Sequence, residues 1–236
     1  MKHTNIIRVA AALAAALFTA ACGSNNCGTA TVVLLDGSCS RVNLAAYHDA
    51  WARISARVGP GDRLVLGRIT SDVREFRPDL DIVRPAPWIL LDNPLDRDDR
   101  AKAFNAQVMT AFTKALEVPC SGRTAILDTL DIAARLLTAD PRPHHTLVIL
   151  SDMLEDSDVA RFESGLTPRQ ASKLVETRRN DRNLPNLTAT EVQVVGAAAP
   201  SGALTREVQR FWMSYLEASG ATLKPEHYGP VLFGYE

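Results

Sequence analysis

Residues 31–40 read TVVLLDGSCS, a β-branched and aliphatic run that ends at Asp36-Gly37 and leads into two serines. A continuous apolar run of this length is typical of a strand that is buried on both faces, as in a parallel sheet. Further strands are predicted at residues 63–69, 146–150 and 191–195, with a weaker edge candidate at 74–84 and a short one within 222–233.

Apolar residues at helical spacing occupy the segments between these strands. They predict helices over residues 44–58, 124–137, 168–179 and 204–218, and a further helix that Asp96 caps and that runs to Leu116. The Pro- and Asp-rich segment 85–99 is interpreted as a surface excursion. Strands that alternate with helices predict an α/β fold of three layers (α/β/α), with a mostly parallel central sheet flanked by helices.

The composition is that of a soluble globular chain. The 236 residues include 46% hydrophobic and 22% charged residues, with 26 Lys and Arg against 27 Asp and Glu. A net charge of −1 gives no electrostatic footprint for nucleic acid, and no such partner is expected. Four cysteines are too few for a scaffold built from disulfides.

The first residues have the pattern of an export signal. Lys2 and Arg8 form a positive region, an apolar stretch follows at 9–18, and small residues lead directly to Cys22. The apolar stretch is too short to span a bilayer as a helix. We therefore expect a signal peptide at 1–21, a tether at 22–30 and one domain at 31–236.

Cys22, placed directly after small residues, resembles the cysteine of a bacterial lipoprotein box. The resemblance implies that its thiol is diacylated and that the chain is cut before it, which anchors the protein to a membrane without spanning it. Thr19 stands three residues before the cysteine, where Leu is commoner in the lipoprotein box. The alternative is cleavage by an ordinary signal peptidase, with Cys22 incidental. Gly23 and Ser24 favour the periplasmic face of the outer membrane.

Small oxygen-bearing side chains lie in three loops, two directly after predicted strands and one at the start of a predicted helix. In open α/β sheets, ligands bind outside the carboxyl ends of the strands. The first group comes after strand 31–35, the second opens helix 124–137, and the third follows strand 146–150. Carboxylates and hydroxyls are hard ligands that suit Mg²⁺ or Mn²⁺ and not Zn²⁺. The candidate ligands are Asp36, Ser38, Ser40, Thr124 and Asp152.

This arrangement resembles the von Willebrand factor A (VWA) family, a Rossmann-like fold, and its metal-ion-dependent adhesion site. The family pattern is Asp-x-Ser-x-Ser after the first strand, a Thr in a second loop and an Asp after the fourth strand. The resemblance implies that the hydroxyls ligate directly, the aspartates directly or through water, and that one position stays open for an acidic side chain of a protein partner. Met153 follows Asp152 where the family often has Gly.

Two cysteines lie beside the expected metal loops. Cys39 is inside the first loop, and Cys120 lies four residues before Thr124. If the fold is as expected, a disulfide between Cys39 and Cys120 braces the site, although free thiols or a pairing with Cys27 remain alternatives. Cys39 as a nucleophile is poorly supported, because no histidine is placed to act as its base.

The aromatic residues Phe211, Trp212 and Tyr215 lie at helical spacing, which favours a core-facing edge over a recognition stripe. The leading functional hypothesis is a membrane-anchored binding protein whose divalent metal engages a protein partner. The alternatives are a metal-dependent phosphoester hydrolase and a metal-free scaffold for envelope assembly.

Overall fold

The computed structural model describes residues 28–38, 43–85 and 93–234. In it, β1 (Thr29–Asp36) lies near the middle of a six-stranded sheet with the order β3-β2-β1-β4-β5-β6. The other strands are β2 (Arg63–Ile69), β3 (Leu80–Val83), β4 (His144–Leu150), β5 (Thr190–Val195) and β6 (Tyr228–Gly229). All pairs are parallel except β2 with β3, which is antiparallel at the edge. The weak edge candidate at 74–84 is therefore confirmed as an antiparallel strand, shortened to four residues.

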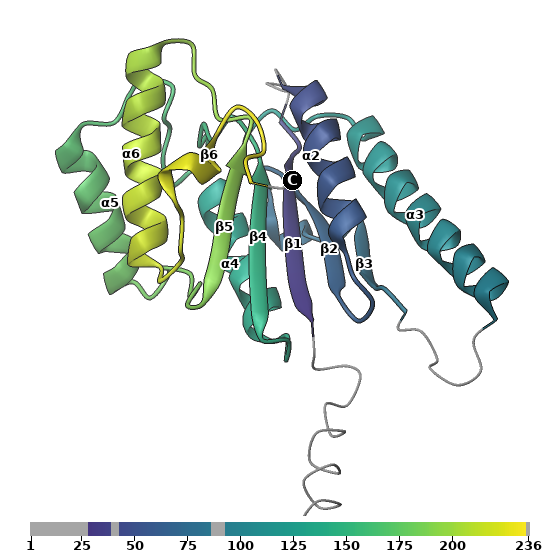
Figure 1. Ribbon diagram of the computed structural model, residues 1–236. Helices are drawn as coiled ribbons and strands as arrows, with labels where there is room; N and C mark the ends of the chain where they lie inside the picture. Colours follow the sequence, from purple (N-terminus) through teal and green to yellow (C-terminus); the bar gives the residue numbers. More distant parts are fainter. Residues whose placement is uncertain (1–27, 39–42, 86–92, 235–236) are drawn as a thin grey trace, which may run out of the picture.

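Helices cover both faces of the sheet (Figure 1). α2 (Leu44–Arg57) and α3 (Pro94–Glu117) lie on one face. On the other, α4 (Ile126–Thr138) and α6 (Gly202–Ala218) pack against the sheet, with α5 (Pro168–Asn180) beside α6. Two short 3-10 helices, η1 (Val73–Glu75) and η2 (Pro225–His227), complete the elements. The expected three-layer α/β/α fold with a mostly parallel sheet is confirmed.

The central strand explains why its sequence is continuously apolar. Val32 and Leu34 belong to the core under α4 and α6, whereas Val33 and Leu35 belong to the core under α2 and α3. All four side chains are at most 2% exposed. Since successive side chains of a strand point to opposite faces, a strand covered on both sides needs apolar residues at every position.

The start of α3 differs from the prediction. The helix begins at Pro94, and its N-cap is Asn93 and not Asp96, because the Asn93 side chain accepts a hydrogen bond from the Leu95 amide at 3.2 Å. A proline in the first helical position has no amide to leave unpaired, so Asn93-Pro94 is a strong start signal. The prediction of a surface excursion over residues 85–99 is therefore wrong for residues 94–99, which form the first turns of α3.

The aromatic residues of α6 are buried as expected. Phe211, Trp212 and Tyr215 are at most 2% exposed and pack with one another and with Phe162. No helix in the described ranges has the length and apolar character needed to cross a membrane.

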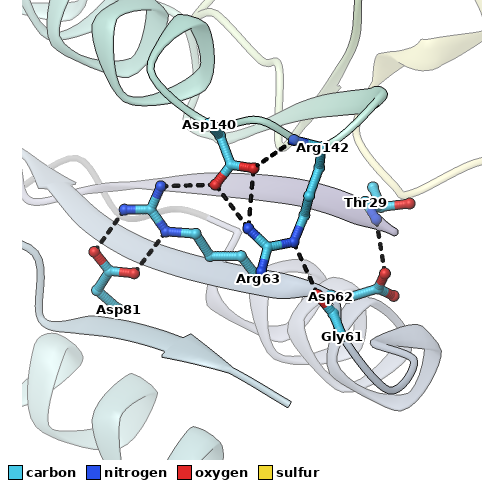
Figure 2. A network of polar contacts seen from close by, with 7 residues as sticks. All are labelled: Thr29, Gly61, Asp62, Arg63, Asp81, Asp140 and Arg142. Carbon is cyan, nitrogen blue, oxygen red and sulfur yellow. Dashed lines mark hydrogen bonds and ion pairs between the residues drawn. The ribbon is translucent and has the colours of Figure 1, made fainter. Parts of the chain in front are cut away.

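A chain of alternating charges ties together the end of the sheet where β1 begins (Figure 2). Arg63 makes two hydrogen bonds to Asp81, at 2.8 and 2.7 Å, and one to Asp140 at 2.9 Å. The buried Arg142 binds both carboxylate oxygens of Asp140 at 2.9 Å and donates to the Gly61 carbonyl at 2.8 Å. Burial opposes ionisation of Asp140, but the hydrogen bonds from Arg142 and Arg63 outweigh it and lower its pKa.

Replacing Arg142 by methionine is expected to destabilise the fold by roughly 2–3 kcal/mol. The variant leaves the buried Asp140 with Arg63 as its remaining cation, so the cost stays below that of an entirely unpaired charge. Denaturant unfolding measures the change. The control is Arg135→Met, which removes an exposed ion pair with Asp131 and should cost about 0.5 kcal/mol or less. Equal costs for the two variants would contradict the role assigned to Arg142.

Candidate metal site at the carboxyl end of the sheet

Asp36 ends β1 at the point where two neighbouring strands also end. In the sheet register, Asp36 pairs with Ile69 of β2, and Leu35 pairs with Leu150 of β4. The carboxylate accepts one hydrogen bond from the Ser38 amide at 2.8 Å and another from the Ser151 hydroxyl at 2.7 Å. The first and third predicted ligand loops are therefore joined directly through Asp36.

The first loop also contacts the second. Ser38 forms an isolated β-bridge with Ser121, whose amide donates to the Gly37 carbonyl at 2.8 Å. Gly37 in turn donates to the Ile69 carbonyl at 2.9 Å, and a Cβ at this position would lie 2.7 Å from that oxygen. The backbone therefore approaches β2 so closely that only glycine fits between Asp36 and Ser38.

Thr124 lies just before α4 and is held by its backbone. Its amide donates to the Asp156 carbonyl at 3.0 Å and its carbonyl accepts from the Asp156 amide at 2.9 Å, while Ala125 donates to the Thr70 carbonyl at 3.2 Å. Thr124 is 4% exposed, and its hydroxyl makes no hydrogen bond within residues 28–38, 43–85 and 93–234. That hydroxyl is therefore available as a ligand. The predicted helix start at 124 is two residues early, which leaves Thr124 in the loop.

The third loop turns sharply at the residue that follows Asp152. Met153 adopts φ 67°, the left-handed conformation that glycine favours, in the position where the family often has Gly. Its side chain is fully buried, and its carbonyl accepts a hydrogen bond from the Trp212 indole at 2.9 Å. Packing thus holds the unfavourable backbone in place, and Asp152 keeps a turn in which it accepts from the Leu154 amide at 2.9 Å.

Asp36 and Asp152 are buried carboxylates, with exposed fractions of 2% and 6%. Asp36 forms no ion pair with a side chain in the described part of the chain. Burial of a carboxylate is costly unless hydrogen bonds or a positive charge compensate it. A divalent cation would supply that charge at the junction of the three loops.

The donor set fits a hard cation bound mainly through hydroxyls. Within the ranges that the structure describes, no group of three or more His, Cys, Asp or Glu side chains is arranged to hold a metal ion. The expected set includes only two carboxylates, so Ser38 and Thr124 have to supply further oxygen ligands. Such a set suits Mg²⁺ or Mn²⁺, which also retain water ligands.

Three predicted residues lie outside the described residues: Ser40, Cys39 and the lipidation candidate Cys22. Cys120 is described and is disulfide-bonded. The remaining cysteines, Cys22, Cys27 and Cys39, all lie outside the described ranges. The pairing of Cys39 with Cys120 therefore stays a prediction.

Two residues near the site were not among the predicted ligands. Ser151 could have been found, because it immediately precedes Asp152 at the end of β4. Glu155 carries no such sequence signal. It is fully buried, and its carboxylate accepts from the Leu127 amide at 3.0 Å in the first turn of α4. Burial raises the pKa of Glu155 to about 7, although hydrogen bonds from the α4 amides act in the opposite direction.

Glu155 is expected to make stability depend on pH. Because its pKa is higher in the folded state than the ordinary value of 4.5, the folded chain binds more protons between pH 4.5 and about 7. The free energy of unfolding therefore falls as pH rises through this window, by roughly 2–3 kcal/mol. Glu155→Gln keeps an acceptor for Leu127 and should remove that decline. Denaturant unfolding at several pH values measures it, and identical pH profiles for both proteins would contradict the assignment.

No protein-family model matches this chain, and no curated protein matches it. Solved structures do match. The D319A mutant of the PilB minor pilin from Streptococcus sanguinis is similar at 12% identity with a TM-score of 0.50, over 84% of this chain and 56% of that one. At this identity the likeness shows a shared fold and nothing of function.

Two further solved structures are similar at lower TM-scores. One is a von Willebrand factor type A protein from Catenulispora acidiphila, with 14% identity and a TM-score of 0.47 over 83% of this chain and 38% of that one. The other is the manganese-loaded TRAP protein of Plasmodium vivax, with 13% identity and a TM-score of 0.39 over 78% and 63%. The chain thus spans less than two thirds of the length of each of these proteins.

Proposed function

We propose that this chain is an exported, membrane-anchored VWA-like binding protein that uses a divalent cation to engage a protein partner. The cation is Mg²⁺ or Mn²⁺. Its ligands are Asp36, Ser38, Ser40, Thr124 and Asp152, acting directly or through water. An open coordination position takes an acidic side chain of the partner.

The observation that carries the proposal is the junction of the three loops around Asp36. Its carboxylate bonds to Ser38 and Ser151, and the first loop bonds to Ser121 of the second. Asp36 is nearly inaccessible and has no cationic side chain as partner among the described residues. Two carboxylates and several hydroxyls at one sheet end form a negative, oxygen-rich site that a hard cation would complement.

A bound cation would supply a strong local charge that attracts a carboxylate of another protein. The chain's own residues determine how that charge is presented. Ser151 and the Ser38 amide orient Asp36, while the pairing of Thr124 with Asp156 fixes the second loop. These contacts give the ligands a rigid base, which reduces the entropy lost when a partner binds.

The position of the site also suits a tethered binding protein. β1 begins at Thr29 and ends at Asp36, so its two ends lie about 23 Å apart along the strand. β1 begins at the end of the sheet opposite the candidate metal site (Figure 1), so any tether that precedes it is attached at that end. An anchor at Cys22 would therefore leave the three loops directed away from the membrane.

Affinity capture from a membrane extract tests the proposal. The purified exported chain serves as bait in Mg²⁺, in EDTA, and in EDTA followed by excess Mg²⁺. We expect a captured protein that EDTA releases and that Mg²⁺ restores. Asp36→Ala should not capture this protein even in Mg²⁺. Asp49→Ala is its matched control, because it removes an exposed aspartate whose ion-pair partner is Arg53. It should capture the same protein as the native chain.

The other outcomes identify the competing functions. Capture that EDTA does not affect would contradict the metal-dependent proposal and favour a metal-free scaffold. Phosphoester hydrolysis that requires Mg²⁺ or Mn²⁺ and is lost in Asp36→Ala would favour a hydrolase.

A further inference from the structure

The helical turn that follows Thr124 is held by side chains from outside its own helix. α4 begins two residues after Thr124, and its N-cap is Ala125, whose side chain makes no capping hydrogen bond. The start of a helix leaves backbone amides unpaired unless other groups satisfy them. In this chain, two side chains from distant segments contact the first turn of α4.

Both contacts meet at Leu127, in that first turn. The Leu127 amide donates to the buried carboxylate of Glu155 at 3.0 Å. The Leu127 carbonyl accepts a hydrogen bond from Arg178 Nη2 at 3.1 Å. Arg178 Nη1 also donates to the carboxylate of the next residue, Asp128, at 2.7 Å. The turn is therefore fixed on one side by the loop after β4 and on the other by α5.

Arg178 is the residue through which α5 makes this contact. Of the residues of α5, all of which the structure describes, it is the one that is buried, with 6% of its surface exposed. The apolar residues Leu174 and Val175 of the same helix are only partly buried. Burying a guanidinium is costly unless it is paired and hydrogen-bonded. Arg178 meets this condition through the first turn of α4.

The position of this turn determines where Thr124 lies. Asp156, the residue after Glu155, pairs with Thr124 through both backbone groups, at 3.0 and 2.9 Å. The pair Glu155–Asp156 thus holds both Thr124 and the first turn of α4, and Arg178 holds the same turn from α5. A shift of the turn would therefore move Thr124 relative to the other two loops of the candidate metal site.

We propose that Arg178 is a positioning residue for the metal site. It fixes the first turn of α4 and thereby keeps the Thr124 hydroxyl within reach of a cation that the other two loops bind. Loss of a hydrogen-bonded group that supports metal ligands typically lowers metal affinity 10–100-fold. The inference rests on the metal-binding part of the proposed function and is independent of the membrane anchor and of the partner's identity.

The test compares Arg178→Met with Arg142→Met. Both variants remove a buried arginine that pairs with an aspartate, but Arg142 lies at the opposite end of the sheet, where β1 begins. A titration in which electron paramagnetic resonance detects free Mn²⁺ measures the affinity. We expect Arg178→Met to bind Mn²⁺ roughly 10-fold more weakly than the native chain, and Arg142→Met to bind it as the native chain does. Native affinity in Arg178→Met, or an equal loss in both variants, would overturn the proposal.

The variant Thr124→Ala shows whether Arg178 acts through Thr124. If it does, adding Arg178→Met to Thr124→Ala should cause little further loss of Mn²⁺ affinity, because the effects of coupled residues are not additive. A further loss of roughly 10-fold, as large as in the native background, would overturn the proposal.

Hydrogen exchange in EDTA provides a readout that needs no metal. The amides of Thr124 and Leu127 donate to the segment Glu155–Asp156. Both should exchange faster in Arg178→Met than in Arg142→Met, because the first turn of α4 opens more readily without its contact to α5. Equal exchange at these amides in the two variants would overturn the proposal.

Arg178→Lys keeps the test decisive if Arg178→Met does not fold. Lysine retains a positive charge for Asp128 but lacks the planar fork that reaches two acceptors at once. It should therefore also bind Mn²⁺ more weakly than the native chain, and native affinity in this variant would overturn the proposal.

Failure of this inference is separable from failure of the proposed function. A native chain that binds no Mn²⁺ would overturn the proposed function and the inference with it. Native Mn²⁺ binding that the substitution of Arg178 does not weaken would overturn the inference alone.

Discussion

Replacing Asp36 by alanine is expected to lower the affinity of the chain for Mn²⁺ by at least about 100-fold, because substitution of outer-sphere groups alone costs 10–100-fold. Asp36 is the residue to which the other two loops connect, through Ser38 and Ser151. Its removal takes away negative charge and also the acceptor that orients both serines. Calorimetric titration with Mn²⁺ measures the loss.

The same variant should remain folded. Since Asp36 has no ion-pair partner among the described side chains, its removal leaves no cation unpaired. Circular dichroism and denaturant unfolding should therefore show a native fold. Asp49→Ala, the exposed control, should bind Mn²⁺ as the native chain does. Native affinity in Asp36→Ala would contradict the assigned site.

Replacing Trp212 by alanine is expected to destabilise the fold by about 3–5 kcal/mol. The side chain is fully buried and its ring packs with those of Phe162, Phe211 and Tyr215. The indole also donates to the Met153 carbonyl at 2.9 Å, directly after Asp152. The substitution therefore creates a cavity and leaves a buried carbonyl in the third loop without its donor. Denaturant unfolding measures the loss.

A pair of milder variants separates the hydrogen bond from the cavity. Trp212→Phe removes the donor and keeps most of the apolar volume. Trp51→Phe makes the same change at a fully buried tryptophan whose indole nitrogen has no hydrogen-bond partner in the part of the chain that the structure describes. Trp212→Phe should be the more destabilising by about 1–3 kcal/mol, and it alone should weaken Mn²⁺ binding. If the two variants lowered stability and Mn²⁺ affinity equally, the hydrogen bond from Trp212 to Met153 would not support the third loop.

The strands could be predicted because burial on both faces leaves a direct trace in the sequence. The β2 bounds match the predicted 63–69, and the apolar run at 31–35 lies within β1. Helix ends were harder, since competing caps stand close together. Asp96 looked like a cap, but Asn93 followed by proline forms the stronger start signal.

For the candidate site, the sequence indicated which loops would meet but not how they bond. Parallel strands bring their carboxyl ends to one edge, so Asp36 and Asp152, which each follow a predicted parallel strand, were expected at the same edge of the sheet. The left-handed conformation of Met153 could not be read from a residue type that rarely adopts it. The burial of Glu155 against α4 depends on a loop pairing between distant segments, which has no periodic pattern.

Equilibrium dialysis of the native exported chain against Mn²⁺, with the bound metal counted per chain, tests the central claim most directly. The account predicts that binding saturates near one Mn²⁺ per chain and that excess Mg²⁺ displaces the bound ion. A native, folded chain that binds no Mn²⁺ would contradict the metal site and the binding function built on it.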